Sequence, residues 1–124
     1  MLASSKLQTI VLTSRLAEAE RFYSDVLGLR LKGKSDGALV YDVGGGELRI
    51  SPVPSTQPSV HTVVGFAISD LRAVMSALGA RGVQWERFLG FPHDAEAVVV
   101  TPGGAKVAWF RDLDGNLLSV VQYP

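Results

Sequence analysis

One order of elements occurs twice along the chain, and it constrains the fold more than any other feature. In each half, a short apolar strand precedes a helix that ends at glycine, and several strand-like runs follow. The two helical segments can be aligned over three pairs of residues: Ser14 with Ser69, Leu16 with Leu71 and, after one gap, Gly28 with Gly82. A repeated order of this kind is the sequence signature of an internal duplication. We therefore expect two related modules.

The first module is expected over residues 1–57. β-Branched and apolar residues predict a buried strand over Leu7–Thr13, and Ser14 is expected to cap a helix that ends at Gly28. Three strands should follow: Leu29–Lys34, Ala38–Val43 and Glu47–Pro52. Gly44-Gly45-Gly46 joins two of these strands and opens no helix, so it indicates a hairpin turn and not a phosphate-binding loop.

The second module is expected over residues 58–124, after a polar, proline-containing connection at Pro52–Ser59. The predicted elements are a strand at His61–Ser69, a helix at Asp70–Arg81, and strands at Val83–Leu89, Ala95–Thr101, Lys106–Arg111 and Leu117–Tyr123. The acidic segment Asp112–Asn116 is interpreted as a turn. It lacks the further oxygen ligands and the closing glutamate of a calcium loop.

Composition excludes several classes of function. The chain has 124 residues, which suits a single domain over 1–124. Its 12 basic and 12 acidic residues balance, so we expect no nucleic-acid partner and no membrane partner. The absence of cysteine excludes disulfides and thiolate metal sites. Without a signal-like N-terminus or a long apolar run, the sequence predicts a soluble, cytoplasmic protein.

Three segments carry a resemblance to a known superfamily. They are RFYSDVLGL at 21–29, FAISDLRAVMSALGARGV at 66–83 and WFRDLDGNLLSVVQ at 109–122. Together they resemble the vicinal-oxygen-chelate superfamily, which includes glyoxalases, bleomycin-resistance proteins and extradiol dioxygenases. The resemblance implies an α+β fold in which two βαβββ modules form a curved mixed sheet around a ligand pocket. It also implies a homodimer.

The resemblance also raises the question of a metal. In metal-dependent relatives, the first and last strand of each module donate one ligand apiece. The corresponding positions here are Gln8, Val63, Ser119 and either Arg49 or Ile50. Only Gln8 has a side chain suited to a divalent ion. We therefore expect no metal and no other cofactor.

The two histidines offer weaker alternatives. His61 lies two residues before Val63, so on an extended strand both side chains would point to one face. His61 is the candidate catalytic residue. His93 and Glu96 have a spacing that resembles a metal pair, but Pro92 and the surrounding residues favour a loop, in which this spacing does not align the two groups.

Strand alternation predicts a largely apolar pocket lining with few polar groups. The segment Phe88–Glu96 is a candidate lid, and Arg49 is a candidate anchor for an anion. For the aromatic residues, packing in the core is the alternative to lining the pocket. The candidate ligand-binding residues are Gln8, Ile10, Arg49, His61, Val63, Phe91, His93, Trp109 and Ser119.

Three functions stay open. The first is metal-free binding of a small apolar or aromatic molecule, without chemical change. The second is an enzyme of the lyase, isomerase or dioxygenase type, which would use Gln8 with further ligands, or His61 with a carboxylate. A third alternative is an accessory interaction module with no small-molecule ligand.

Overall fold

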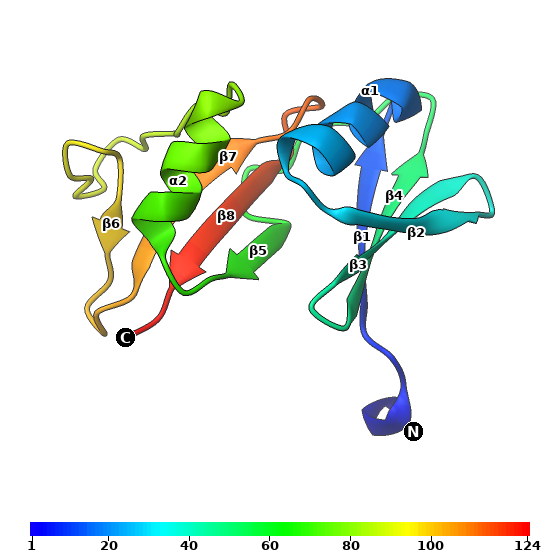
Figure 1. Ribbon diagram of the computed structural model, residues 1–124, viewed down its shortest axis with the longest axis horizontal. Coiled ribbons are helices and arrows are strands. Elements are labelled where there is room, and N and C mark those ends of the chain that lie inside the picture. The colour runs from blue at the N-terminus through cyan, green and yellow to red at the C-terminus, as the bar shows by residue number, and fades with distance from the viewer. The chain divides into compact units, whose positions relative to one another are not determined.

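The computed structural model describes residues 1–124, which form two compact units, Met1–Gln57 and Pro58–Pro124. Each unit contains one four-stranded mixed sheet and one main helical segment (Figure 1). No helix in the chain has the length and apolar character needed to cross a membrane. The assignment of both modules to a single domain stays a prediction.

Unit 1 is built on a sheet with the order β1-β4-β3-β2. Strands β1 and β4 are parallel, and the other neighbours are antiparallel. A short 3-10 turn, Leu2–Ser4, precedes the sheet. The elements are β1 (Gln8–Thr13), α1 (Leu16–Glu20) with its continuation η2 (Arg21–Val26), β2 (Arg30–Ser35), β3 (Ala38–Val43) and β4 (Gly46–Pro52).

Unit 2 repeats this topology with the order β5-β8-β7-β6. Its first and last strands, β5 and β8, are again parallel neighbours. The elements are β5 (Val64–Ala67), α2 (Leu71–Ala80), β6 (Val99–Val100), β7 (Lys106–Arg111) and β8 (Leu117–Gln122). The predicted βαβββ order is therefore found in both units, as expected for a duplicated module.

The two helices begin differently. Asp70 caps α2 through its side chain, which accepts a hydrogen bond from the Ala73 N–H at 3.1 Å. The prediction that Ser14 caps the first helix was wrong: Arg15 is the cap position, and its own N–H donates to Thr13 Oγ1 at 3.1 Å. The sequence correctly placed glycine at both helix ends, where Gly28 and Gly82 have φ of 70° and 96°.

The first helix widens after its first turn. The segment η2 is π-helical, and the Leu27 N–H donates to the Phe22 carbonyl five residues earlier at 2.9 Å. Tyr23 from this segment is fully buried and contacts the Tyr41 ring on β3, with ring centroids 6.1 Å apart. Leu48 pairs with Tyr41 across β3 and β4, and Val11 lies on the same side of the sheet. The helical segment therefore covers the face of unit 1 on which Tyr41, Leu48 and Val11 lie.

In unit 2, a backbone contact identifies the face that α2 covers. The side chain of Gln122 accepts a hydrogen bond from the Leu71 N–H at 2.9 Å, so alternate residues of β8, Val120 and Leu118, face α2 as well. Leu118 is fully buried and Val120 is 2% exposed. Ser119, between them, points to the opposite face, which no helix of unit 2 covers. We call this the open face of unit 2.

Two strand predictions in unit 2 were wrong. Val83–Leu89 forms no strand, and the run predicted over Ala95–Thr101 is reduced to β6. The segment Val83–Leu89 makes only one backbone hydrogen bond of the kind found between strands: the Glu86 N–H donates to the Trp109 carbonyl at 2.8 Å. After Glu86, the chain leaves the edge of β7, and the backbone N–H of Phe88 donates a hydrogen bond to the ring of His93.

Candidate functional site

The structure resolves which residues occupy the four positions at which metal-dependent relatives carry ligands. Gln8 lies seven residues before the cap position of α1, and Val63 lies seven before the cap of α2, so these two correspond. Two residues further on, Ile10 pairs with Arg49, and Gly65 pairs with Ser119. By this correspondence the last-strand position of unit 1 falls on Arg49, whereas Ile50 is fully buried in the core, and a ligand-binding role of Arg49 stays a prediction.

These four residues do not form a donor set suited to a divalent metal. Unit 1 supplies the Gln8 amide and the Arg49 guanidinium, and unit 2 supplies the Val63 hydrocarbon and the Ser119 hydroxyl. A guanidinium has no lone pair to offer, and a valine has no donor atom. Nor does the chain bring together three or more His, Cys, Asp or Glu side chains in an arrangement that could hold an ion. The residues at these positions therefore do not fit the superfamily metal.

The uncovered face of unit 1 presents both apolar and polar side chains. Ile10 and Leu12 are 53% and 42% exposed, whereas Val11 between them is 3% exposed. Gln8 is exposed on the same face. Arg49 is half-buried there and donates from Nη2 to the Ser35 carbonyl at 2.9 Å, which draws the guanidinium toward the β2–β3 turn. The role of these side chains in ligand binding stays a prediction.

His61 does not lie on the strand that was predicted for it. Strand β5 begins only at Val64, so His61 belongs to the preceding connection and is exposed. Its backbone N–H donates to Ser59 Oγ at 3.2 Å, in a local turn. The expectation that His61 and Val63 share one strand face was therefore wrong, because strand alternation does not extend to residue 61.

Both ring nitrogens of His93 are hydrogen-bonded to backbone groups of its own loop. The Phe88 N–H donates to Nε2 at 2.9 Å, so Nε2 carries no proton. Nδ1 must then carry the proton, and it donates to the Ala97 carbonyl at 2.7 Å. With both ring nitrogens occupied, His93 has none left for a metal. Its main effect is to close the loop between Phe88 and Ala97.

Four rings gather on the open face of unit 2. They form what we call the aromatic cluster: Phe88, Phe91, His93 and Trp109. The centroids of Phe88 and Trp109 lie 5.4 Å apart at 78°, and those of Phe91 and Trp109 lie 6.1 Å apart at 84°. Phe91 is 53% exposed, so one ring of a packed group is presented to the surface. The cluster brings together three of the predicted ligand-binding residues, and Phe88 joins them.

A pair of salt bridges ties the loop of the aromatic cluster to α2. Arg72 on α2 donates from Nη2 to Asp94 Oδ2 and from Nη1 to Glu96 Oε1, both at 2.7 Å. Asp94 Oδ1 in turn accepts the N–H groups of Glu96 and Val98 at 2.9 Å. The segment predicted as a lid is therefore a bonded loop in this structure. Sequence reasoning missed Arg72, because nothing in its local sequence points to partners 22 and 24 residues away.

The two salt bridges of Arg72 with Asp94 and Glu96, which we call the clamp of Arg72, make the stability of the loop depend on pH. The hydrogen bond from Arg72, followed by that from the Val98 N–H, lowers the pKa of Asp94 from 3.8 to about 2. Because the folded-state pKa is depressed, the contribution of this carboxylate to folding stability is present above pH 3.8 and is lost as the pH falls through about 2.

In Arg72→Ala, we expect the pKa of Asp94 to rise toward its ordinary value, as measured by NMR titration of the carboxyl carbon. Arg87→Ala is the matched control, since Arg87 bonds only the Ala95 carbonyl of the same loop. An unchanged Asp94 pKa in Arg72→Ala would contradict this clamp.

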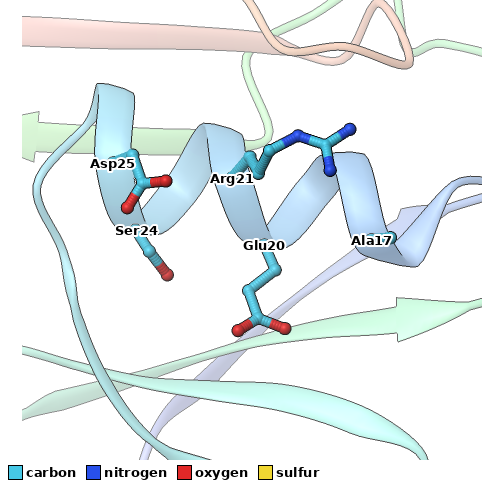
Figure 2. A pocket seen from close by; sticks show the side chains of 5 residues that line it. All are labelled: Ala17, Glu20, Arg21, Ser24 and Asp25. Carbon is cyan, nitrogen blue, oxygen red and sulfur yellow. The ribbon is translucent and has the colours of Figure 1, made fainter.

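A hollow of about 310 Å³ lies on the first helical segment of unit 1 and not on either sheet face (Figure 2). Its polar groups already have partners. Ser24 Oγ lies 2.8 Å from the Tyr41 hydroxyl, and Glu20 pairs with Lys34 at 3.3 Å. Burial of Tyr41 raises the pKa of its hydroxyl despite the hydrogen bond between it and Ser24, so this pair stays uncharged at neutral pH. The hollow offers no unpaired group for chemistry, and we assign it no function.

The paired βαβββ topology and the four corresponding strand positions define a chain of the glyoxalase-like class of α+β folds. The chain belongs to the Glyoxalase/Bleomycin resistance protein/Dioxygenase superfamily, whose family model matches residues 7–120. The expected superfamily and fold class are thus confirmed.

Solved structures of the same superfamily share the fold. A glyoxalase family protein from Bacillus anthracis is 15% identical with a TM-score of 0.76, over 98% of this chain and 96% of its own. A lactoylglutathione lyase from Agrobacterium tumefaciens is 21% identical with a TM-score of 0.72, over 96% and 93%. A glyoxalase family protein from Enterococcus faecalis is 18% identical with a TM-score of 0.76, over 98% and 99%. No curated protein sequence matches the chain, and identities this low extend the likeness to the fold alone.

Proposed function

We propose that this protein binds a small apolar or aromatic molecule without a metal and without changing it chemically. The observation that carries the proposal is the chemistry of the four positions at which metal-dependent relatives bind their ion. Arg49, Val63 and Ser119 replace the imidazole and carboxylate groups that such a site needs, and Gln8 alone is suited to it. The exposed apolar side chains of unit 1 and the aromatic cluster of unit 2 support the nature of the ligand.

The metal-free part of the proposal is tested by elemental analysis. Protein purified without chelator should contain well under a tenth of an equivalent of Zn, Ni, Mn or Fe, since three of the four positions offer no suitable donor. As a positive control, a metal-dependent member of the superfamily should be purified in parallel and should retain its ion. A near-stoichiometric metal content that survives gel filtration would contradict the proposal.

The binding part is tested with two planar probes, naphthalene and carbostyril. A ligand that binds only the folded state at a hundredfold excess over its dissociation constant stabilises the protein by about 2.7 kcal/mol, so we expect an upward shift of Tm that grows with probe concentration. The probes should be recovered unchanged after incubation. The enzymatic alternative predicts the opposite outcome, conversion of a probe or of another substrate. Turnover that survives dialysis against chelator and is lost in His61→Ala would favour the metal-free version of that alternative, in which His61 acts with a carboxylate.

The proposal also includes a homodimer and a single-domain arrangement of the two modules, as implied by the superfamily resemblance. The homodimer is testable in solution without a ligand. Light scattering coupled to gel filtration should give twice the 13.3 kDa chain mass. A monomeric mass at micromolar concentration would contradict the dimer and leave the binding function untouched.

A further inference from the structure

We infer that the open face of unit 2 is a binding site for a neutral, planar aromatic molecule that stacks on Phe91 and forms a hydrogen bond with Ser119. This inference rests on the proposed function and names the ligand class and the part of the chain that recognises it. Three observations carry it: the state of the Ser119 hydroxyl, the packing of the aromatic cluster, and the charge of the surrounding face.

The Ser119 hydroxyl is a hydrogen-bonding group without a protein partner. Ser119 is only 7% exposed, yet no protein group accepts from or donates to its Oγ. Since no fully enclosed side-chain polar atom in the chain lacks a partner, this Oγ keeps an opening to the surface. A largely buried hydroxyl that is left unpaired costs free energy unless water or a ligand satisfies it.

Gly65 gives this hydroxyl its space. Gly65 pairs with Ser119 across β5 and β8, and a Cβ built on Gly65 would lie 3.1 Å from Ser119 Oγ. The hydroxyl therefore lies over the bare backbone of Gly65, on the open face. On the other side, Ser119 pairs with Trp109 of β7, so the three residues form a row across three strands. Cross-strand neighbours such as Ser119 and Trp109 have Cβ atoms about 4.5–5.5 Å apart. Because Trp109 belongs to the aromatic cluster, one bicyclic ligand can span the distance from the Ser119 hydroxyl to this cluster.

The packing of the aromatic cluster selects a flat ligand and not a cation. An aromatic cage needs a gap between its rings, whereas the rings of Phe88, Phe91 and Trp109 contact one another edge to face at 5.4 to 6.1 Å. Nothing can enter between them. His93 stacks on Phe91 with ring centroids 6.2 Å apart at 26°, and Phe91 is still 53% exposed, so its exposed side remains for stacking with another planar ring.

The surrounding face carries no unpaired charge, which selects a neutral ligand. The residues that share the open face with Ser119 are Val63, Gly65, Ala67, Leu117, Val121, Val107, Trp109, Val99 and Arg111. Arg111 is neutralised, because its Nε donates to Glu86 Oε1 at 2.6 Å and its Nη1 donates to the Gly115 carbonyl. An anionic ligand would find no free cation, and a cationic one no free carboxylate, on this row.

The clamp of Arg72 gives the site its order before any ligand arrives. Through Asp94 and Glu96, Arg72 holds the loop on which Phe88, Phe91 and His93 lie. In this role Arg72 is a positioning residue. A preordered loop does not lose its conformational freedom again on binding, which favours affinity.

The experiment compares three probes by titration calorimetry: carbostyril, which is neutral and carries a lactam; naphthalene, which has no hydrogen-bonding group; and naphthoate, which is anionic. We expect Phe91→Ala to weaken carbostyril and naphthalene alike, by about tenfold, because both stack on the lost ring. Ser119→Ala should weaken carbostyril by about two- to tenfold, as the loss of one hydrogen bond implies, and leave naphthalene unchanged. Naphthoate should bind more weakly than either.

Two further variants keep the test sharp. Gly65→Ala should reproduce the effect of Ser119→Ala, since its methyl group would displace the hydroxyl. Leu89→Ala is the matched control: it lies in the same loop, is fully exposed and takes no part in the ring contacts, so all affinities should stay at the wild-type value. If carbostyril binds but Ser119→Ala and Phe91→Ala bind it as tightly as wild type, the site is wrong and the proposed function stands. If none of the probes binds to the wild-type protein, both are wrong.

Discussion

Phe110→Ala is expected to destabilise the protein by about 3–5 kcal/mol, the usual cost of removing a fully packed aromatic side chain from a core. Phe110 is 1% exposed on β7, and its ring meets that of Trp85 edge to face at 5.4 Å. The substitution removes both the buried surface and this ring contact and leaves a cavity. Since small domains have a total stability of about 5–15 kcal/mol, the loss should be visible as a large drop in the urea midpoint.

The control for this prediction is Val100→Ala in the same unit. Val100 is apolar but 55% exposed on β6, so the change should stay within about 0.5 kcal/mol. Urea unfolding followed by circular dichroism measures both variants, and an unchanged m-value shows that stability alone has changed. A loss of less than about 1 kcal/mol for Phe110→Ala would mean that the helix-covered face of unit 2 is not packed as described.

Strands whose pairing is local were predictable from the sequence. Ala38–Val43 and Lys106–Arg111 have the predicted bounds, because turn residues flank each run and an antiparallel neighbour follows directly in the chain. The glycines at the helix ends were equally readable, since only a residue without Cβ suits the left-handed conformation there. For these elements, local chemistry and tertiary pairing agree.

The failures occur where a local preference competes with distant contacts. Val83–Leu89 has the composition of a strand, but along the edge of β7 it makes only one ladder-like hydrogen bond, from the Glu86 N–H to the Trp109 carbonyl. His93, by binding the Phe88 N–H, gives the backbone an alternative to a ladder. Neither the edge nor the histidine contact can be read from a window of local sequence.

The candidate site was predictable in part for the same reason. Counting back from the strand-to-helix corners led to Gln8 and Val63, and counting from Asn116 led to Ser119, because strand and helix lengths repeat between the modules. The choice between Arg49 and Ile50 needed the register of β1 and β4, which depends on residues about 40 positions apart. The free Ser119 hydroxyl depends on Gly65 of a different strand, so only the folded structure brings that feature to light.

Asp112→Ala is the second substitution for which a large loss is expected, about 3 kcal/mol. Asp112 lies in the turn between β7 and β8 and is 7% exposed. Its Oδ1 accepts the N–H groups of Asp114 and Asn116, and its Oδ2 accepts the Asn116 side-chain amide, each at 2.9 Å. Asn116 is itself 6% exposed, so alanine at position 112 would leave buried donors unsatisfied at about 1–3 kcal/mol each.

Asp112→Asn separates the hydrogen bonds from the space that the side chain fills. Asparagine retains one oxygen acceptor for the backbone N–H groups, but its NH₂ group would face the amide of Asn116, a donor opposite a donor. We therefore expect a loss between zero and that of Asp112→Ala, measured by the same urea titration. Equal losses in the two variants would show that the Asn116 amide contact dominates the turn. A loss below about 1 kcal/mol in Asp112→Ala would contradict the role assigned to this carboxylate.

The turn at Asp112 sets the register of β8 against β7, so it also determines where Ser119 lies relative to Trp109. Carbostyril binding should therefore weaken in any variant that shifts this register.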